Sequence, residues 1–238
     1  MAEINGTQGP DNLMGTQEVD TILGFGGDDT LFGLQNNDFI QGDDGNDLIF
    51  GNQGGDFLRG GAGADTLFGG QDDDNLTDSS PPDSASRNFL YGNKGNDTLF
   101  INEGFLYGGQ GDDSIIGGSG VTNLSGDFGR DTLVGGSGRD IFTITPKDQV
   151  FNSADADRIQ GFDPNSRDIL FLETGSGLTA NDVTLTPDVA SNSTAIIIAA
   201  TGQVLAVLEN TLLTKEDIPN LIQPSGNPLA INNFMELF

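Results

Sequence analysis

The sequence predicts an all-β protein, built as a parallel β-solenoid with a β-rich cap at its C-terminal end. Three observations lead to this prediction. Eight nine-residue units follow one another without a gap from Gly6 to Thr77. Every unit has Gly in place one, Asp in place six and an aliphatic residue in place eight. Self-similarity at a fixed period is the signature of stacked repeat architectures.

Each unit has room for one short strand and one tight turn. Its Gly-rich first half is turn material, because Gly tolerates a positive φ. Its aliphatic residue is flanked by residues that point the other way, so it forms a strand with one inward side chain. A single unit cannot bury that side chain, but stacked units can. The inward residues are Leu13, Ile22, Leu31, Ile40, Ile49, Leu58, Leu67 and Leu76.

The aspartates of place six form a column in such a stack. Layers of a parallel coil lie about 4.8 Å apart. Carboxylates at that spacing repel by about 1 kcal/mol in water, and several times more at lower dielectric. The column therefore indicates cations between the layers. Carboxylates and the carbonyls of Gly turns are hard oxygen ligands, which suit Ca²⁺.

The units resemble the repeats-in-toxin (RTX, hemolysin-type calcium-binding) nonapeptide, G-G-x-G-x-D-x-U-x. This resemblance implies a right-handed parallel β-roll with two nonapeptides per coil, and several Ca²⁺ ions held in the turns between units two apart. The alternative is a Gly- and Asp-rich disordered tract. Disorder does not require an aliphatic residue at every ninth position, so we favour the roll.

Alternate units stack on opposite edges of the coil, which we name the odd edge and the even edge. Odd units keep Gly in place four, and we expect the calcium sites on this edge. The expected odd-edge ligands are Asp11, Asp29, Asp47 and Asp65, with backbone carbonyls near Gly9, Gly27, Gly45 and Gly63. The even edge departs from the pattern at place four, so its aspartates are weaker candidates: Asp20, Asp38, Asp56 and Asp74. The glutamines of its third place are either a stacked amide ladder or solvated turn residues: Gln17, Gln35, Gln53 and Gln71.

Place nine of the odd units is apolar and should point outward. It forms a stripe, which is either covered by later segments of the chain or is an assembly surface, because exposed apolar stripes of this size usually mark contacts. The stripe consists of Met14, Phe32, Phe50 and Phe68.

The register breaks at residues 78–87, where Pro81 and Pro82 cannot continue a ladder, so we expect an insertion loop. The repeats then resume to about residue 144. The later repeats supply a second set of expected calcium ligands: Asp97, Asp113 and Asp131, with Asp140 as a separate candidate. Whether this set continues the odd edge depends on how the insertion is counted, and the sequence leaves that open.

Residues 145–224 are predicted to cap the roll, because a solenoid end exposes an unpaired edge. Their segment 155–173 is similar to the one that closes the β-roll in serralysin-type proteases. Residues 225–238 resemble the uncleaved C-terminal signals of type I secretion substrates. The alternatives for this tail are a final strand or a loose end. Since residues 1–12 lack a basic and apolar signal sequence, the resemblance implies a secreted, extracellular or cell-surface protein.

The composition of the chain argues against several classes of function. The net charge of −27 argues against nucleic acid and anionic membranes and in favour of cations as partners. No apolar run is long enough to span a membrane. The chain has neither His nor Cys, which excludes zinc-protease sites, Ser-His-Asp triads and Cys nucleophiles. Carboxylate pairs for glycoside chemistry are already placed in the metal turns. We therefore expect that this protein is not an enzyme.

The leading hypothesis is a secreted calcium-binding structural protein. It would fold, and self-assemble into an oligomer or polymer, on extracellular calcium as part of a surface layer, sheath, matrix or filament. The alternative is a calcium-dependent adhesion module that binds a polysaccharide or a cell surface. Ice binding is a minor alternative, because places five and seven of the odd edge are too irregular for the required rows.

Overall fold

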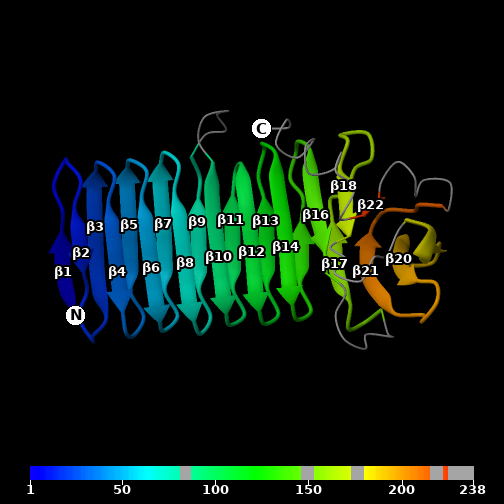
Figure 1. Cartoon of the computed structure of the whole chain (residues 1–238), viewed down its shortest axis with the longest axis horizontal. Helices are drawn as coiled ribbons and strands as arrows, with labels where there is room; N and C mark the ends of the chain where they lie inside the picture. The colour runs from blue at the N-terminus through cyan, green and yellow to red at the C-terminus, as the bar shows by residue number, and fades with distance from the viewer. Residues whose placement is uncertain (81–86, 146–152, 173–179, 215–221, 225–238) are drawn as a thin grey trace.

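The structure is a computed structural model that describes residues 1–80, 87–145, 153–172, 180–214 and 222–224. Apart from one short 3₁₀ turn, η1 (Ala180–Asp182), the regular structure of these residues is entirely β. The strands form a long roll whose layers follow one another along its axis (Figure 1). The all-β parallel solenoid predicted from the repeats is confirmed.

Two facing sheets make up the roll, and strands consecutive in sequence alternate between them. The first sheet, sheet A, contains in spatial order β1 (Ala2–Asn5), β3 (Asp20–Gly26), β5 (Phe39–Asp44), β7 (Phe57–Ala62), β9 (Asn75–Asp78), β11 (Thr98–Ile101), β13 (Ser114–Gly117), β15 (Thr132–Val134), β17 (Asp157–Gln160), β21 (Val204–Glu209), β20 (Ser193–Ile198) and β19 (Val183–Asp188). The second, sheet B, contains β2 (Asn12–Met14), β4 (Thr30–Leu34), β6 (Leu48–Gln53), β8 (Thr66–Gln71), β10 (Asn88–Lys94), β12 (Gly104–Gln110), β14 (Thr122–Phe128), β16 (Asp140–Ile144), β18 (Ile169–Leu172) and β22 (Ile222–Pro224).

The strand register follows the repeat. Ile4 pairs with Ile22 and then Ile40 in sheet A, and Leu13 pairs with Leu31 in sheet B. Each step is two nonapeptides, so one coil contains one odd and one even unit. A slip by one residue would turn every inward side chain to the outside, so the aliphatic residue of place eight fixes the register.

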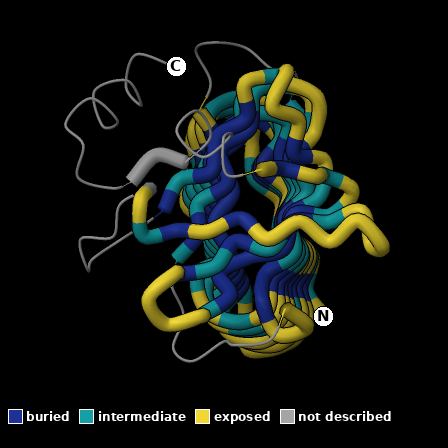
Figure 2. The backbone as a smooth tube through the Cα atoms, turned by 90° about the vertical axis from the view of Figure 1, so that its right-hand side faces the viewer, coloured by how far each residue is buried: buried dark blue, intermediate teal, exposed yellow. Residues whose placement is uncertain are grey.

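The core is a file of these aliphatic side chains between the two sheets. From Ile22 to Leu76 each is completely buried, and Leu90, Leu99, Leu106, Ile115 and Leu124 continue the file in the later repeats. Seen along the roll, buried residues line the space between the sheets and exposed residues lie at the turns (Figure 2). In the first eight repeats each unit contributes one aliphatic side chain to this file, which makes the core narrow there.

The break at residues 78–87 lengthens one turn and does not disturb the alternation of strands. Its central residues, 81–86, lie outside the described part. On either side of it, β9 joins sheet A and β10 joins sheet B, where Leu90 pairs with Leu67. The longer turn replaces an odd-edge turn, so Asp97, which precedes β11 of sheet A, lies on the even edge. This settles the question that the sequence left open.

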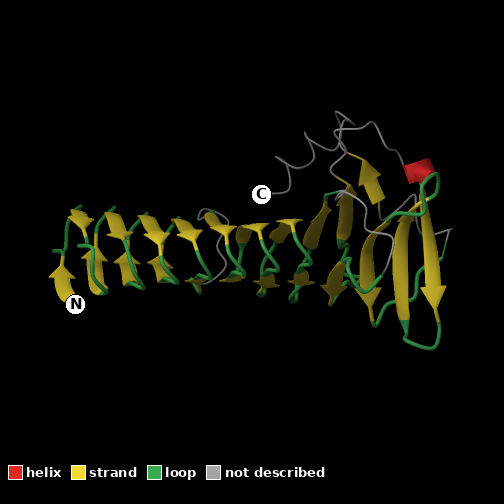
Figure 3. Cartoon of the chain, turned by 90° about the horizontal axis from the view of Figure 1, so that it is seen from below, coloured by secondary structure: helices red, strands yellow, loops and turns green. Residues whose placement is uncertain are grey.

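The roll extends beyond its predicted end at residue 144. β17 pairs in parallel with β15, and β18 with β16, which adds a further coil after two long connections. The cap begins where β21 joins β17 in parallel and is followed by antiparallel pairs with β20 and β19 (Figure 3). Glu209 of β21 ties the cap to the roll through an ion pair with Arg158, at 2.5 Å, and a hydrogen bond from Gln160. The predicted secretion tail, 225–238, lies outside the described residues.

Candidate metal sites

Aspartates of place six line both edges of the roll, each at the residue that leads into a strand. The backbone amide of one aspartate donates to Oδ1 of the aspartate in the next layer. Asp29 donates to Asp47 at 2.9 Å on the odd edge, and Asp38 donates to Asp56 at 2.8 Å on the even edge. The ladder occupies one oxygen of each carboxylate and fixes its orientation.

The second carboxylate oxygen, Oδ2, is buried along most of both columns and has no hydrogen-bond partner among the described residues. Leaving a buried charged oxygen without a partner is costly. These oxygens therefore indicate that a cation belongs beside them. They belong to Asp29, Asp38, Asp47, Asp56, Asp65, Asp74, Asp97 and Asp140.

Place-one glycines leave the space into which these oxygens point. A Cβ placed on Gly33 would lie 2.5 Å from Oδ2 of Asp38 and 2.8 Å from the carbonyl oxygen of Gly51 in the next layer. A carboxylate and a carbonyl thus converge where any other residue would place a side chain. Calcium prefers these oxygen donors, and the residues of the repeat fit it.

Burial raises the pKa of these carboxyls. It raises the pKa of Asp47 to about 6, that of Asp56 to about 7 and that of Asp74 to about 8, and the aspartates of adjacent layers add to the effect. Hydrogen bonds from backbone amides act in the opposite direction. A bound divalent cation would remove both the burial penalty and the repulsion between layers.

The two edges have the same turn conformation despite their different sequences. In place four, Gly27 and Gly45 of the odd edge have φ of 99° and 139°. Asn36 and Asp72 of the even edge have φ of 68° and 74° in the same place. Asn and Asp enter the left-handed region more readily than other residues with a side chain. The even edge, which the sequence ranks as weaker, therefore presents its carboxylates in the same way.

The amide ladder considered for the even edge is not found. Between the described side chains of Gln17, Gln35, Gln53 and Gln71 there is no hydrogen bond. Along this edge the ladder is made by aspartates. It runs through Asp20, Asp38, Asp56, Asp74, Asp97, Asp113, Asp131 and Asp157.

The predicted set of Asp97, Asp113 and Asp131 thus continues the even edge. The odd edge loses its aspartates in the same layers, where Asn88, Gly104 and Thr122 occupy place six. It regains one at Asp140, whose Oδ1 accepts a hydrogen bond from the Thr122 hydroxyl at 2.5 Å. After the insertion, therefore, the unbroken column of aspartates lies on the even edge.

Two aspartates of the columns were missed in the sequence. Asp131 donates to Oδ1 of Asp157 at 2.8 Å, and Asp140 donates to Oδ1 of Asp168 at 2.9 Å. Both stand two residues before an inward aliphatic residue, as in every repeat. An Asp two residues before an aliphatic residue was the signal that could have identified them. The long connections before β17 and β18 interrupt the period of nine and hide it.

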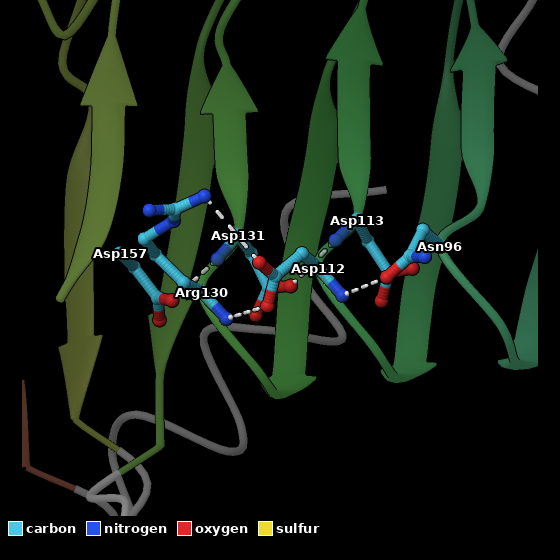
Figure 4. A network of polar contacts seen from close by, with 6 residues as sticks. All are labelled: Asn96, Asp112, Asp113, Arg130, Asp131 and Asp157. Atoms are coloured by element: carbon cyan, nitrogen blue, oxygen red, sulfur yellow. Dashed lines mark hydrogen bonds and ion pairs between the residues drawn. The ribbon is translucent and has the colours of Figure 1, made fainter. Parts of the chain in front are cut away.

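Place five forms a second ladder, which was also missed. Its side-chain oxygen accepts from the place-five amide of the following layer, opposite in direction to the ladder of place six. On the even edge Asp112 donates to Oδ1 of Asn96 at 2.8 Å, and Arg130 donates to Oδ1 of Asp112 at 2.9 Å (Figure 4). The Arg130 guanidinium also forms an ion pair with Asp112, at 3.4 Å. The signal was the frequency of Asn and Asp in place five.

The first coil differs from the others. Oδ2 of Asp11 accepts hydrogen bonds from the amide and the hydroxyl of Thr7, at 2.5 and 2.9 Å. Thr16 makes the same pair of hydrogen bonds to Asp20. The sequence predicts Asp11 as a calcium ligand, together with Asp29 and Asp47. Its second oxygen is instead already paired within its own turn.

The aromatic stripe lies on the outer side of sheet B and is longer than predicted. Phe32 stacks on Phe50 with ring centroids 5.0 Å apart, and Phe50 on Phe68 at 5.1 Å. Tyr91 and Tyr107 extend the stack across the insertion. Met14, at the open end, is 60% exposed, whereas the stacked rings are half-buried by one another.

The described residues contain no group of three or more acidic side chains close enough to hold one metal ion. Sites on these edges would therefore combine few carboxylates with backbone carbonyls. No helix in the described part of the chain is long and apolar enough to cross a membrane.

The chain matches a model of the RTX calcium-binding nonapeptide repeat at residues 5–40, 41–76, 83–104, 105–124 and 116–143. No curated protein matches the chain. The matched segments cover most of the two edges described above and more than half of the sequence. The protein therefore belongs to the family of RTX calcium-binding nonapeptide repeat proteins.

Proposed function

We propose that this protein is a secreted structural protein that folds when it reaches extracellular calcium. The observation that carries the proposal is the run of buried, unpartnered Oδ2 atoms along both edges. With little calcium, these oxygens and the net charge of −27 oppose the stacked roll. With calcium, the free energy of metal binding becomes free energy of folding.

This proposal couples export to folding. A chain that stays unfolded where calcium is scarce can be exported before it folds. Secretion through the tail 225–238 is part of the same proposal. Removing that tail should leave the protein inside the producing cell, while calcium-induced folding of the purified chain stays unchanged.

Self-assembly is supported by the aromatic stack of sheet B. The described strands that follow the roll extend sheets A and B at their ends. A second copy of the chain is the partner we propose for the stripe, which would give a filament, layer or sheath. A catalytic role is not proposed, because the sequence offers neither His nor Cys and the carboxylates of its aspartate columns take part in the ladders.

Calcium-dependent adhesion to a polysaccharide is the second candidate. A groove of about 520 Å³ runs along the even edge and is lined by Phe39, Phe57, Asn37, Asp73 and Asn96. Phe39 and Phe57 are 36% and 39% exposed. Apolar rings beside amides and carboxylates suit the mixed surface of a sugar chain.

The experiment that tests the folding proposal compares circular dichroism and hydrodynamic radius with and without calcium. Chelation should abolish the β signal and expand the chain, and an unchanged signal and radius would refute calcium-dependent folding. Electron microscopy of the same samples separates the two candidates. Ordered polymers with calcium support the structural role, whereas a monomer retained on a glycan column supports adhesion.

A further inference from the structure

Asp78 is an exception within the repeat. Asp78 stands in place one, where all eight units of the first third have Gly. The register of β7 and β9 puts it opposite Gly60. It ends β9, immediately before the lengthened turn. Its side chain has an exposed fraction of 0%, so a second carboxylate is completely buried beside the odd-edge column.

Asp78 and Asp65 point their free oxygens into the same space. A Cβ placed on Gly60 would lie 2.6 Å from Oδ2 of Asp65 and 2.7 Å from Oδ2 of Asp78. Asp65 also has an exposed fraction of 0%. Neither of these oxygens has a hydrogen-bond partner among the described residues. In the earlier layers of this column, at Gly24 and Gly42, a carboxylate oxygen meets a carbonyl in this space, but here it meets a second carboxylate.

A hydrogen-bond network holds the two carboxylates in this orientation. Oδ1 of Asp78 accepts from the amide and the hydroxyl of Ser80, at 2.9 and 2.7 Å. Asn88 donates to the Ser80 hydroxyl at 3.0 Å and accepts from the Asp65 amide at 2.7 Å. Asn102 in the next layer fixes the backbone through the Ser80 carbonyl, at 3.0 Å. Oδ1 of Asp78 faces this network, and Oδ1 of Asp65 accepts from the Asp47 amide at 2.8 Å, which leaves both Oδ2 atoms in the space beside Gly60.

We propose that Asp65 and Asp78 bind one calcium ion between them, in a site that the nonapeptide pattern does not contain, and that this site binds calcium most tightly on the chain. Calcium affinity increases with the number of charged ligands. A turn with one free carboxylate supplies one negative charge, whereas this site supplies two. Carbonyls and water complete the coordination. The inference rests on the calcium-dependent folding proposed above and names its tightest site.

Its position gives the site a structural consequence. In the two layers after Asp65 the odd edge has no aspartate in place six, because Asn88 and Gly104 stand there. The ion between Asp65 and Asp78 would therefore close the first series of odd-edge sites, where the lengthened turn begins. It would hold together the two parts of the roll at the point where the period of nine is interrupted.

The test uses the full chain, folded in saturating calcium and then titrated with a calcium chelator, with ion release and β circular dichroism measured together. In wild-type protein the last ion should leave at a free calcium concentration about tenfold below the others. Asp78→Asn keeps the shape and removes the charge, and Asp78→Gly restores the residue of the repeat. In both variants the tight step should be lost while the remaining ions bind as before.

Two matched variants make the result specific. Asp44→Asn removes the same charge from an exposed carboxylate of the roll and should keep the tight step. Asp74→Asn removes a column carboxylate on the even edge and should cost an ion of the weaker class only. A tight step that survives in both Asp78 variants overturns the inference, even where calcium-dependent folding is intact. An unchanged calcium titration, combined with greater stability of Asp78→Asn in chelator, also overturns it and identifies the pair as two carboxyls that share a proton.

Discussion

Thr16 donates two hydrogen bonds to Oδ2 of Asp20, one from its backbone amide at 2.6 Å and one from its hydroxyl at 2.8 Å. Two layers on, the same oxygen of Asp56 has no partner among the described residues. Burial alone would raise the pKa of Asp20, but amide hydrogen bonds from Thr16 and Ala2 hold it below its usual value. The hydrogen bonds of Thr16 thus give this carboxylate oxygen the partner that a calcium ion would provide for the later aspartates.

The backbone explains why threonine closes this turn. In later turns place two has a positive φ, as in Phe25 (74°) and Asn52 (80°), whereas Thr7 and Thr16 are not among the residues with positive φ. A β-branched residue avoids that region strongly. The turn therefore brings the amide and hydroxyl of the threonine to the carboxylate, and the free oxygen of that carboxylate is paired within its own turn.

Replacing this threonine should create a calcium site. We expect Thr16→Gly to remove the hydroxyl and admit a positive φ, and so to bind one more calcium ion per chain than the wild type. Metal content of the calcium-saturated, dialysed protein measures this directly. Asn52→Gly is the matched control, because place two of that turn already has a positive φ, and it should leave the number of ions unchanged. An unaltered ion count in Thr16→Gly would contradict the threonine cap.

The two edges should respond alike to loss of an aspartate. The sequence ranks Asp47 above Asp38, but both have a buried, unpartnered Oδ2, and burial raises the pKa of both to about 6. We expect Asp38→Ala and Asp47→Ala to weaken calcium-driven folding by similar amounts, measured as the midpoint of a calcium titration followed by circular dichroism. A clearly larger loss in Asp47→Ala would instead support the ranking by sequence.

Without metal, acid should favour the folded roll. Burial raises the pKa of Asp56 to about 7 and that of Asp74 to about 8, from an ordinary value of 3.8. A carboxyl with a raised pKa stabilises the fold when it is protonated, and that contribution is lost as the pH rises through its folded-state pKa. Metal-stripped protein should therefore show more β structure at about pH 5 than at about pH 8.5.

Calcium should reverse this dependence, because protons compete with the metal for the same carboxylates. At a fixed, limiting calcium concentration the β signal should rise with pH over the same interval. A metal-stripped protein whose β signal does not change with pH would show that the buried carboxyls do not control the stability of the roll.

Loss of the aromatic stack should abolish assembly but keep the fold. Phe50 stacks on both Phe32 and Phe68, and each ring pair contributes about 0.5–1.5 kcal/mol beyond its burial. The aliphatic file between the sheets does not involve these rings. We expect the double variant Phe32→Ser, Phe50→Ser to keep its calcium-induced β signal and to form no polymers in electron microscopy. The corresponding change of Phe39 and Phe57 on sheet A is the control, and assembly that persists in the sheet B variant would argue against the stripe as the contact.

Much of this architecture could be predicted because one residue type repeats at one place. Ile22 and Leu31 specify their sheets, their inward direction and their register, since a side chain that alternates with outward neighbours has one way to be buried. Asp29 and Asp38 specify the columns in the same way. Each unit contains these signals by itself, so the prediction needs no information about the rest of the chain.

The remaining features could not be predicted, because they depend on parts of the chain that do not follow the repeat pattern. The length of 78–87 does not reveal whether it replaces a turn or half a coil, and so the edge of Asp97 stayed open. Long connections separate Asp157 and Asp168 from the period of nine. Thr7 stands in place two, where the units of this chain carry many different residues, and only the turn shows that its hydroxyl is bonded to the carboxylate.

The stack on sheet B also determines which part of the roll tyrosine fluorescence can follow in solution. The chain has no Trp and two Tyr, and these two, Tyr91 and Tyr107, lie face to face with centroids 5.0 Å apart and planes 6° from parallel. All tyrosine emission therefore comes from one pair of rings, in the two layers that follow the lengthened turn. A fluorescence titration with calcium follows the closure of this one stretch of the roll, while circular dichroism follows the whole, and any difference between the two curves measures how cooperatively the coils fold.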